Sequence, residues 1–278
     1  MGQSNTDMGK LTMAGTLMGA GTRELKGLAV VTGGSSGIGE GCARGLAQRG
    51  ATVAILDINP AGEAVAREIG GHFFHCDVGD DKAFEIVAAA VEAAMGPAEY
   101  LVNSAGILQT SAMKPRDFPI DAWDDIVRVD QRGTYLSCLY FGERMVQRGR
   151  GAIVNIASVA GMMSTPLHSY TPAKAAVIAM THTLAAEWGR SQVRVNAISP
   201  GVTRTPALDA ALKRGDRSLD DLLKVAPLGR LIETSEIANA VAFLLSSEAA
   251  AITGVNLPVD CGWLVSDGWH FYGGLRTP

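Results

Sequence analysis

The chain has 278 residues, of which 47% are hydrophobic and 19% charged, and its formal net charge is −4. This composition excludes a disordered or fibrous chain, and the absence of a basic stripe argues against a nucleic-acid partner. Four cysteines without a Cys-x-x-Cys pair, and no run of 18 apolar residues, predict a cytoplasmic protein with reduced thiols, no metal site and no membrane span.

We predict a flexible leader over residues 1–24, because this stretch is rich in Met and Gly and lacks hydrophobic periodicity. It has no charged start followed by an apolar core, so it is not a secretory signal. Residues 1–6 match the short N-myristoylation pattern, which arises easily by chance. The folded domain is expected to span 25–278, including an aromatic C-terminal tail.

From Leu25 onward, short runs rich in Val and Ile alternate with helical periodicity. The runs are apolar on both faces, which is typical of strands covered by helices on each side. The pattern predicts an α/β fold: a single-domain, doubly wound parallel sheet (Rossmann-like) of about seven strands. The predicted strands are Leu28–Thr32, Thr52–Asp57, His72–Asp77, Tyr100–Asn103, Ala152–Ala157, Val193–Ile198 and Gly254–Val259. The predicted helices are Ile38–Arg49, Pro60–Ile69, Asp81–Met95, Asp121–Arg148, Tyr170–Trp188 and Ser235–Ser247, the last capped by Thr234 or Ser235.

Two regions break this alternation. Residues 200–230 carry three prolines and a charged stretch, which predicts one or two short helices on a mobile loop. Residues 261–278 carry Trp263 and the aromatic run Trp269–Tyr272 beyond the last strand. Large aromatic side chains there are expected to pack against a second subunit.

A glycine-rich turn, Gly33-Gly34-Ser35-Ser36-Gly37-Ile38-Gly39, joins the first strand to the first helix. Glycines let the backbone approach a pyrophosphate, which the helix N-terminus stabilises. Eighteen residues after Gly39, Asp57 closes the second strand. A carboxylate there accepts hydrogen bonds from the ribose of NAD and repels the 2′-phosphate of NADP, so the pattern predicts NAD rather than NADP. The alternative is a tight strand–helix corner with Asp57 as a loop cap.

A hydroxyl, a phenol and an amine follow the fifth predicted strand: Ser158, Tyr170 and Lys174. Tyr and Lys four residues apart lie on one helix face. An ammonium about 4 Å from a phenol contributes on the order of 4 kcal/mol at an effective dielectric of 20, enough to bring a pKa near 10 into the working range. The spacing therefore predicts an acid/base pair beside a hydroxyl, against the alternative of an ordinary surface pair.

With these residues in hand, the chain resembles the short-chain dehydrogenase/reductase family from Leu25 to Gly262. The resemblance lies in several motifs in the family's order: the glycine turn after Thr32, Asn103-Ser104-Ala105-Gly106, the strand ending at Ser158, Tyr170-x-x-x-Lys174, and the segment Asn196–Thr205. It implies a homotetramer or homodimer. It also implies cofactor contacts from Asp77, Val78, Asn103, Ala105, Gly106, Tyr170, Lys174, Pro200, Gly201, Thr203 and Thr205, beside Gly33, Ser35, Ser36, Gly37, Ile38, Gly39 and Asp57.

The resemblance implies catalytic roles as well. Tyr170 exchanges a proton with the substrate oxygen, Ser158 hydrogen-bonds that oxygen, and Lys174 holds the nicotinamide ribose and lowers the pKa of Tyr170. Asp130 stands where the family has Asn, as the fourth catalytic residue, and an ionised Asp accepts hydrogen bonds without donating them. We hypothesise that Asp130 holds a relay water and moves the pH dependence of the proton path lower. The alternative is that it only bonds backbone, Arg128 or Arg132.

These features predict an NAD-dependent oxidoreductase that interconverts a secondary alcohol and a ketone. The substrate is expected to be a polyol, a sugar or a cyclic alcohol, because the pocket candidates mix polar and apolar groups: Gln109, Met162, Met163, His168 and Trp263. Two alternatives are a dehydratase or epimerase on the same scaffold and a non-catalytic NAD-binding regulator. The histidines lack metal-ligand spacing, so no metal is predicted.

Overall fold

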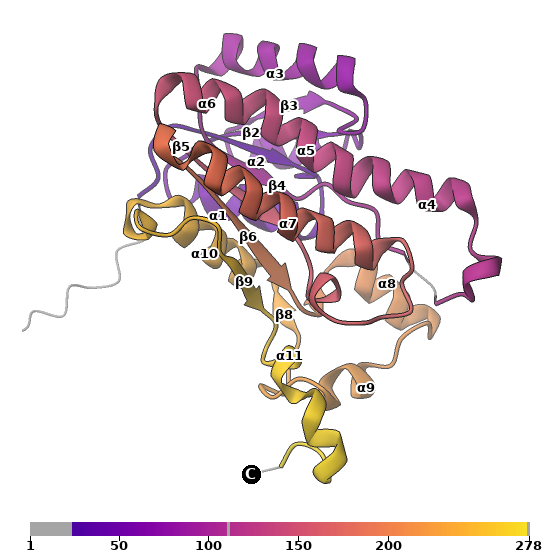
Figure 1. Cartoon of the computed structure of the whole chain (residues 1–278). Helices are drawn as coiled ribbons and strands as arrows, with labels where there is room; N and C mark the ends of the chain where they lie inside the picture. The colour runs from indigo at the N-terminus through magenta and orange to yellow at the C-terminus, as the bar shows by residue number, and fades with distance from the viewer. Residues whose placement is uncertain (1–23, 110–111, 277–278) are drawn as a thin grey trace, which may run out of the picture.

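A parallel sheet with the strand order β3-β2-β1-β4-β5-β6-β9 lies at the centre of the molecule (Figure 1). The computed structural model describes residues 24–109 and 112–276. The strands are β1 Leu28–Thr32, β2 Thr52–Asp57, β3 His72–His75, β4 Ala98–Asn103, β5 Gly151–Ile156, β6 Val193–Pro200 and β9 Asn256–Val259. A two-stranded sheet pairs β7 Thr203–Arg204 with β8 Ile232–Glu233. The predicted α/β fold and its number of strands are confirmed for the described residues.

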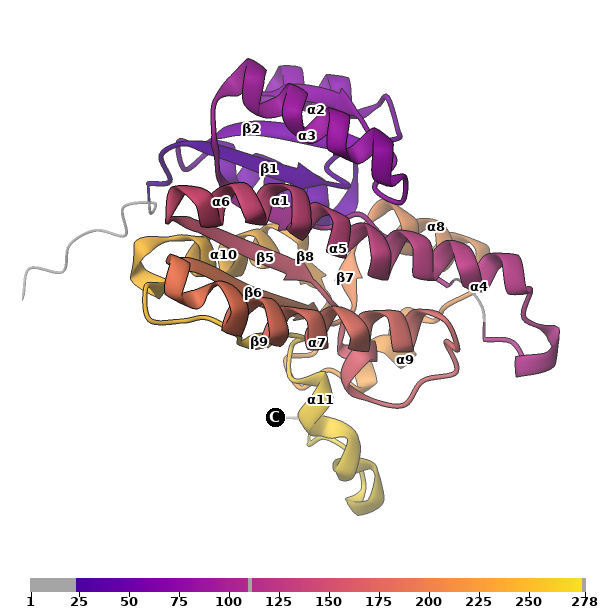
Figure 2. The same cartoon turned by 45° about the horizontal axis from the view of Figure 1, so that its top comes forward.

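Helices cover both faces of the sheet (Figure 2). One face carries α1 Gly37–Ala47, α2 Gly62–Glu68 and α10 Thr234–Leu245. The other carries α3 Asp81–Met95, the long helix from Ile120 to Arg148, and α7 Tyr170–Trp188. The remaining helices with regular α geometry are α8 Pro206–Arg214, α9 Leu219–Lys224 and α11 Trp263–Ser266. Residues 200–230 thus contain two short helices, α8 and α9, where one or two were predicted.

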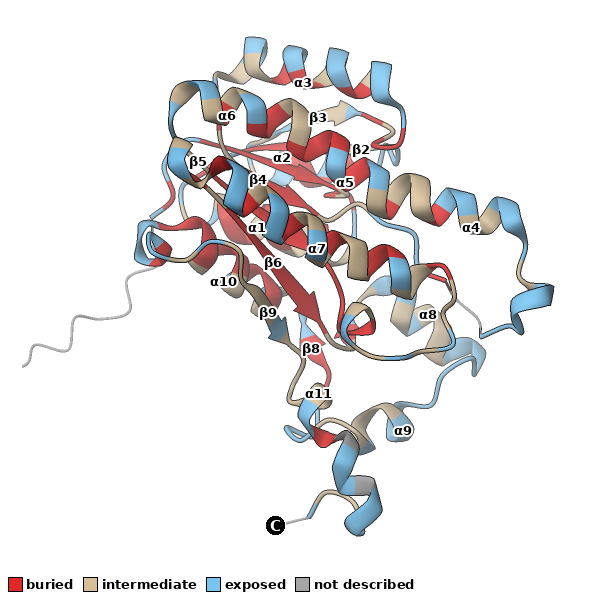
Figure 3. Ribbon diagram, in the orientation of Figure 1, coloured by how far each residue is buried: buried red, intermediate tan, exposed pale blue. Residues whose placement is uncertain are grey.

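Each face of the sheet has its own hydrophobic core, and the buried strands run between them (Figure 3). In β1, Ala29 and Val31 point into the core beneath α1 and α10, whereas Leu28 and Val30 point into the core beneath α3 and α7. Successive side chains of a strand point to opposite faces. This is why the strands read as continuous apolar runs rather than alternating ones.

The long helix departs from the prediction of one regular helix over Asp121–Arg148. It consists of α4 Ile120–Ile126, a π-helical stretch Val127–Gly133, α5 Thr134–Ser137, a second π-helical stretch Cys138–Gly142 and α6 Glu143–Arg148. Wider turns of this kind occur mostly at functional sites, and the first contains Asp130.

The other helix and strand ends differ from their predicted positions by no more than two residues. Helix α7 begins at Tyr170 and holds Pro172 in its first turn, as predicted. The predicted cap of α10 was wrong: Glu233 is the N-cap residue and forms a capping box with Glu236. The cap is made by two Glu side chains rather than by Thr or Ser. The Glu233 side chain accepts the backbone N–H of Glu236, and the Glu236 side chain accepts the backbone N–H of Glu233.

Strands β2 and β3 are added on one side of β1, and β4 and the later strands on the other side. This change of order between β1 and β4 places a crevice at the carboxyl ends of these two strands. The predicted leader, with its myristoylation pattern, lies outside the described residues except for Glu24. Among the helices that the structure describes, none has the length and apolarity needed to span a membrane.

Candidate active site

The glycine-rich turn lies between β1 and α1, against the loop that follows β4. Gly33 and Gly37 have φ values of +69° and +57°, where glycine is favoured over other residues. A Cβ on Gly33 would stand 2.6 Å from the backbone nitrogen of Ala105, and one on Gly39 would overlap the Gly33 carbonyl. The turn is therefore a cradle lined by backbone at the N-terminus of α1. Such a cradle fits a pyrophosphate.

Asp57 lies at the end of β2, beside this turn. Its Oδ2 accepts a hydrogen bond from the Ser35 backbone N–H at 3.0 Å, and its Oδ1 accepts one from Asn59 at 2.9 Å. Asp57 therefore does cap the loop, as the alternative interpretation required. An ionised carboxylate has about four lone-pair sites, so this cap leaves capacity for ribose hydroxyls. Ser36 is the exposed N-cap residue of α1, and Ile38 is partly buried in its first turn.

Asp77 follows β3 and forms an ion pair that the sequence did not predict. Its oxygens lie 3.0 and 2.9 Å from Nη1 of Arg128, and Oδ1 also accepts the Gly79 backbone N–H at 2.8 Å. Partial burial opposes ionisation of Asp77, but the Gly79 N–H and the Arg128 guanidinium outweigh it and hold its pKa below the usual value. Val78 is buried next to it.

The carboxyl ends of three neighbouring strands meet in one row, Thr32, Asn103 and Asn155. Asn103 Nδ2 donates to Asn155 Oδ1 at 2.8 Å and to Cys138 Sγ at 3.2 Å, and Asn155 Nδ2 donates to Thr181 Oγ1 on α7 at 3.0 Å. Burial raises the pKa of the Cys138 thiol to about 12, so it stays a neutral member of this network. Asn155 thus joins the sheet to α7, and Asn103 joins it to the second π-helical stretch through Cys138. The resemblance did not imply these contacts.

The loop after β4 is fixed by backbone bonds. The Thr32 hydroxyl accepts the N–H groups of Ser104 and Ala105 at 3.2 and 3.3 Å. The next residue, Gly106, is exposed to solvent. Ala105 therefore lies against Gly33 of the glycine turn, and the cofactor contacts implied for Ala105 and Gly106 stay a prediction.

The segment after β5 that begins at Ser158 packs against α7, which carries Tyr170 and Lys174. Lys174 Nζ lies 5.5 Å from the centre of the Tyr170 ring and donates to the Ile156 carbonyl at 3.1 Å. Ser158 is buried, and its hydroxyl accepts the Ala160 N–H at 3.1 Å, which holds it at the start of the 3-10 helix η4 Val159–Met162. Lys174 is 5% exposed and Tyr170 is half-buried, so the pair is not an ordinary surface pair.

Asp130 completes this group by direct contact. Its Oδ2 lies 3.1 Å from Lys174 Nζ, and its Oδ1 accepts the backbone N–H of Ile107 at 2.7 Å. Burial opposes the charge on Lys174, but the Asp130 carboxylate and then Tyr170 outweigh it and raise the pKa of the lysine. The π-helical stretch thus carries Asp130 into contact with Lys174. Its role in a relay water's proton path stays a prediction.

Gln109 and His168, two of the substrate candidates, make contacts within the protein. Gln109 is 4% exposed, and its Oε1 accepts both the backbone N–H and the hydroxyl of Ser169, at 3.3 and 3.2 Å. It therefore fixes the residue next to Tyr170. His168 Nε2 lies 3.1 Å from the Met113 carbonyl and lines an open apolar pocket with Phe118 and Trp123.

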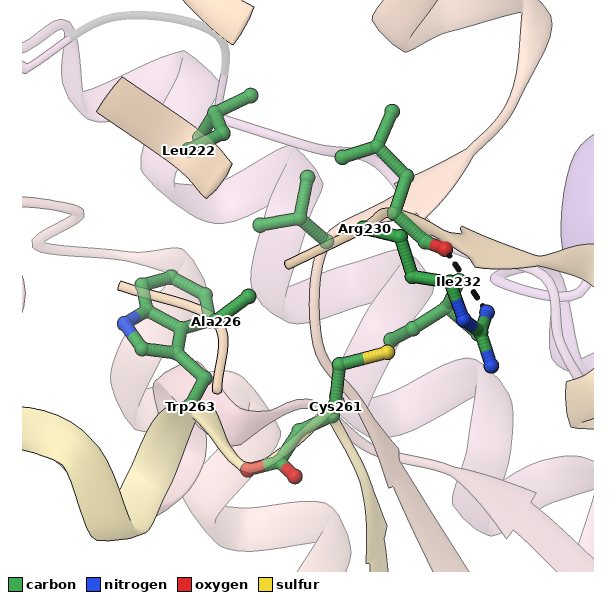
Figure 4. Close-up of a pocket in the computed structure, with 9 residues that line it drawn as sticks. Leu222, Ala226, Arg230, Ile232, Cys261 and Trp263 are labelled. Atoms are coloured by element: carbon green, nitrogen blue, oxygen red, sulfur yellow. Dashed lines mark hydrogen bonds between the residues drawn. The ribbon is translucent and has the colours of Figure 1, made fainter. Parts of the chain in front are cut away.

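Trp263 lines a different, smaller pocket of about 220 Å³, together with Leu222, Ala226, Arg230 and Cys261 (Figure 4). Trp263 is the first residue of α11, and its contact with a substrate stays a prediction. Met162 and Met163 lie in and just after η4, and Met162 is exposed, with its sulfur 3.1 Å from Asn256 Nδ2.

The segment after β6 closes the crevice from the other side. Pro200 ends β6, and a Cβ on Gly201 would stand 2.8 Å from the Asp260 Cα. The Thr203 hydroxyl donates to the Gly201 carbonyl at 3.1 Å. Thr205 caps α8, and its methyl group faces Gly37 of the glycine turn. Thr205 thus lies beside the glycine turn, and contact of Pro200, Gly201 and Thr203 with a cofactor stays a prediction.

Sequence reasoning named Arg128 only as a partner for Asp130 and missed its pairing with Asp77. It also missed Thr181 and Cys138, which give no pattern of their own. No cluster of three or more potential metal ligands occurs in the described part of the chain.

Comparisons with known proteins agree with this geometry. The family model described as enoyl-(acyl carrier protein) reductase matches residues 33–264. The D-threitol dehydrogenase of Mycolicibacterium smegmatis is 40% identical and spans 86% of this chain and 93% of its own length. The 2,5-dichloro-2,5-cyclohexadiene-1,4-diol dehydrogenase of Sphingobium indicum is 38% identical over 84% of this chain and 95% of its own length. A crystal structure from Brucella melitensis 16M described as ribose-5-phosphate isomerase is 49% identical, with a TM-score of 0.90, and covers 92% of this chain and 100% of that one.

The chain belongs to the short-chain dehydrogenase/reductase family, and its relatives include dehydrogenases of polyols and cyclic diols. It is an oxidoreductase of the alcohol dehydrogenase or ketoreductase type.

Proposed function

We propose that this protein is an NAD-dependent dehydrogenase that interconverts a secondary alcohol and its ketone. The observation that carries the proposal is that Tyr170 and Lys174 lie together on α7, which packs against the segment that begins at Ser158, in a chain that also has a glycine cradle that fits a pyrophosphate. A protein that only bound a dinucleotide would not need a phenol, an ammonium and a hydroxyl in this arrangement. The alternative of a non-catalytic regulator is therefore disfavoured.

The side chains have distinct roles in this proposal. When bound, the nicotinamide ring accepts a hydride from the carbinol carbon or returns it. Tyr170 takes the hydroxyl proton during oxidation and returns it during reduction. The Ser158 hydroxyl orients the substrate oxygen, and the Lys174 ammonium, 5.5 Å from the centre of the Tyr170 ring, holds the nicotinamide ribose. Asp130 and the Ile156 carbonyl hold Lys174 in place.

The choice of NAD over NADP rests on Asp57. Its carboxylate is fixed at the edge of the glycine turn by two backbone N–H groups. In this position the carboxylate would accept hydrogen bonds from the ribose hydroxyls of NAD and repel the additional phosphate of NADP. Asp77 and Val78 are proposed to contact the adenine, with Arg128 holding the Asp77 carboxylate in position.

The proposed substrate is a polyol or a cyclic diol. The D-threitol and chlorinated cyclohexadienediol dehydrogenases among the relatives act on compounds with two or more hydroxyl groups, as their names state. His168, Met162 and Met163 supply both polar and apolar surface near the catalytic helix. Gln109 is proposed to support this pocket through Ser169 rather than to contact substrate.

A second candidate follows from the name of the Brucella structure, which describes an isomerase of a sugar phosphate. An isomerase or epimerase on this scaffold would leave the nicotinamide unchanged after each turnover. We favour the dehydrogenase because the relatives named for redox reactions are numerous and span the whole domain.

One assay separates these candidates. Purified protein is incubated with NAD⁺ or NADP⁺ and a panel of polyols and cyclic diols, and absorbance of the reduced nicotinamide is followed. We expect NAD⁺ reduction with at least one substrate and a loss of at least 100-fold in Tyr170→Phe, in line with general acid–base contributions of about 10² to 10⁴. Conversion of ribose 5-phosphate without any absorbance change would support the isomerase instead.

We further propose that the protein is a cytoplasmic homotetramer or homodimer. The C-terminal segment, α11 with the 3-10 helix η7 Asp267–Tyr272, extends away from the domain (Figure 1). Phe271 and Tyr272 are 87% and 89% exposed, and Val265 is also exposed. Exposed aromatic groups of this kind mark interfaces with other protein chains.

A further inference from the structure

The ion pair between Asp130 and Lys174 has a consequence for the redox state of the cofactor. Asp130 is fully buried and the Lys174 side chain is 6% exposed, with 3.1 Å between Oδ2 and Nζ. Because the pair is sequestered from water, its charges are only weakly screened. They therefore act on any other charge that enters the site.

The contacts indicate that both members are charged. An ionised carboxylate is stabilised by an ammonium and a backbone N–H, and Asp130 has both, from Lys174 and Ile107. The two arginines of the same helical stretch are directed elsewhere: Arg128 pairs with Asp77, and Arg132 donates to the Gly79 carbonyl. Tyr170 is the other titratable group beside the lysine. Within these contacts, Asp130 is the counterion of Lys174.

Gly106 seals the carboxylate from the crevice side. A Cβ at this position would stand 3.0 Å from Asp130 Oδ2, so the backbone of the loop after β4 packs directly on the carboxylate. The negative charge therefore lies immediately beneath the segment that borders the crevice.

We propose that Asp130 raises the affinity of the site for the oxidised dinucleotide relative to the reduced one, compared with the same site without this carboxylate. This inference rests on the proposed function. The nicotinamide ring carries a positive charge in NAD⁺ and none in NADH, whereas the pyrophosphate and both riboses are the same in the two. With Asp130, the pair that it forms with Lys174 has a net charge of zero. With the Asn that the family has there, Lys174 would be left with a net charge of +1. The extra charge repels NAD⁺ and leaves NADH nearly unaffected.

The quantity to measure is the ratio of dissociation constants, Kd(NAD⁺)/Kd(NADH), obtained by NADH fluorescence titration and competition with NAD⁺. In Asp130→Asn we expect the ratio to rise about tenfold, the effect of removing a unit charge at roughly 10 Å with an effective dielectric of 20. In Lys174→Met the ratio falls. In the double variant Asp130→Asn/Lys174→Met, which has no charge at either position, it returns to within about threefold of wild type.

A matched control is Asp221→Asn. It removes the same charge from an exposed pair, where Asp221 lies 2.8 Å from Lys224, and the ratio is expected to stay at the wild-type value. If Asp130→Asn does not fold, Lys174→Met and the double variant still decide the outcome.

The possible results separate the two proposals. Equal ratios in wild type, Lys174→Met and the double variant, with both dinucleotides bound, would overturn the role of Asp130 and leave the proposed function intact. Failure of the wild-type protein to bind either NAD⁺ or NADH would overturn the proposed function itself.

Discussion

Replacing Gln109 by Leu is expected to damage the catalytic helix at its first residue. Ser169 is fully buried, and its N–H and hydroxyl both donate to Gln109 Oε1. Leucine removes this acceptor while keeping a side chain of similar size. A buried donor without its partner costs about 1–3 kcal/mol, so we expect a loss of about 3 kcal/mol for the two donors together.

For a domain of this size, 1 kcal/mol corresponds to about 2–4 °C in Tm, so the melting temperature of Gln109→Leu should fall by roughly 6–12 °C. Activity should fall as well, because Tyr170 directly follows Ser169 and a displacement of about 1 Å can cost up to 10²-fold in rate. We expect kcat to drop at least tenfold, with little change in the affinity for NAD⁺.

Thermal unfolding by circular dichroism and steady-state kinetics test this reasoning. Gln109→Glu keeps an oxygen acceptor and should lose less than half as much stability. Gln147→Leu, the same substitution at an exposed position of α6, should stay within about 0.5 kcal/mol of wild type. If Gln109→Leu melts within 1 °C of wild type at unchanged kcat, the contact with Ser169 does not support the catalytic helix.

Three further predictions concern other parts of the molecule. Asp57→Asn keeps an oxygen to cap the turn but removes the charge, so NADP⁺ should bind about tenfold more tightly relative to NAD⁺ in isothermal titration; an unchanged preference would contradict the role of Asp57. The Arg230 guanidinium and the Glu233 N–H lower the pKa of Glu236 from 4.5 to about 2, so the carboxylate stabilises the fold above pH 4.5 and this contribution disappears as the pH falls toward 2. Glu236→Gln should therefore lose about 1 kcal/mol or less at pH 7 and nothing at pH 2 in urea unfolding, since the pair is partly exposed; a loss that does not depend on pH would refute the assignment. Phe271→Ser/Tyr272→Ser should reduce the oligomer size in light scattering, and an unchanged mass would rule out these side chains as the interface.

The sequence predicted the features that depend on local patterns. Continuous apolar strands, the glycine turn and the Tyr170–Lys174 spacing each follow from neighbouring residues, and the structure has all three. Several family motifs in one order also fixed the positions of the strand ends at the crevice.

The sequence could not predict contacts between distant segments. Asp130 and Lys174 are 44 positions apart, and their meeting depends on a π-helical stretch that has no recognisable signature. Gln109 is 60 positions from Ser169, and its polar side chain suggested substrate contact until burial assigned it to the interior.

Helix α7, which carries Tyr170, is held at two points along its length. Gln109 accepts a hydrogen bond from Ser169 at its start, and Asn155 donates one to Thr181 farther along. A helix held at two points has little freedom to move when a substrate binds. Adjustment to ligands of different shape therefore falls to α8 and α9, which bury none of their residues and can shift without opening either core. During evolution toward new substrates, substitutions should accordingly accumulate in residues 206–224, whereas α7 should stay unchanged.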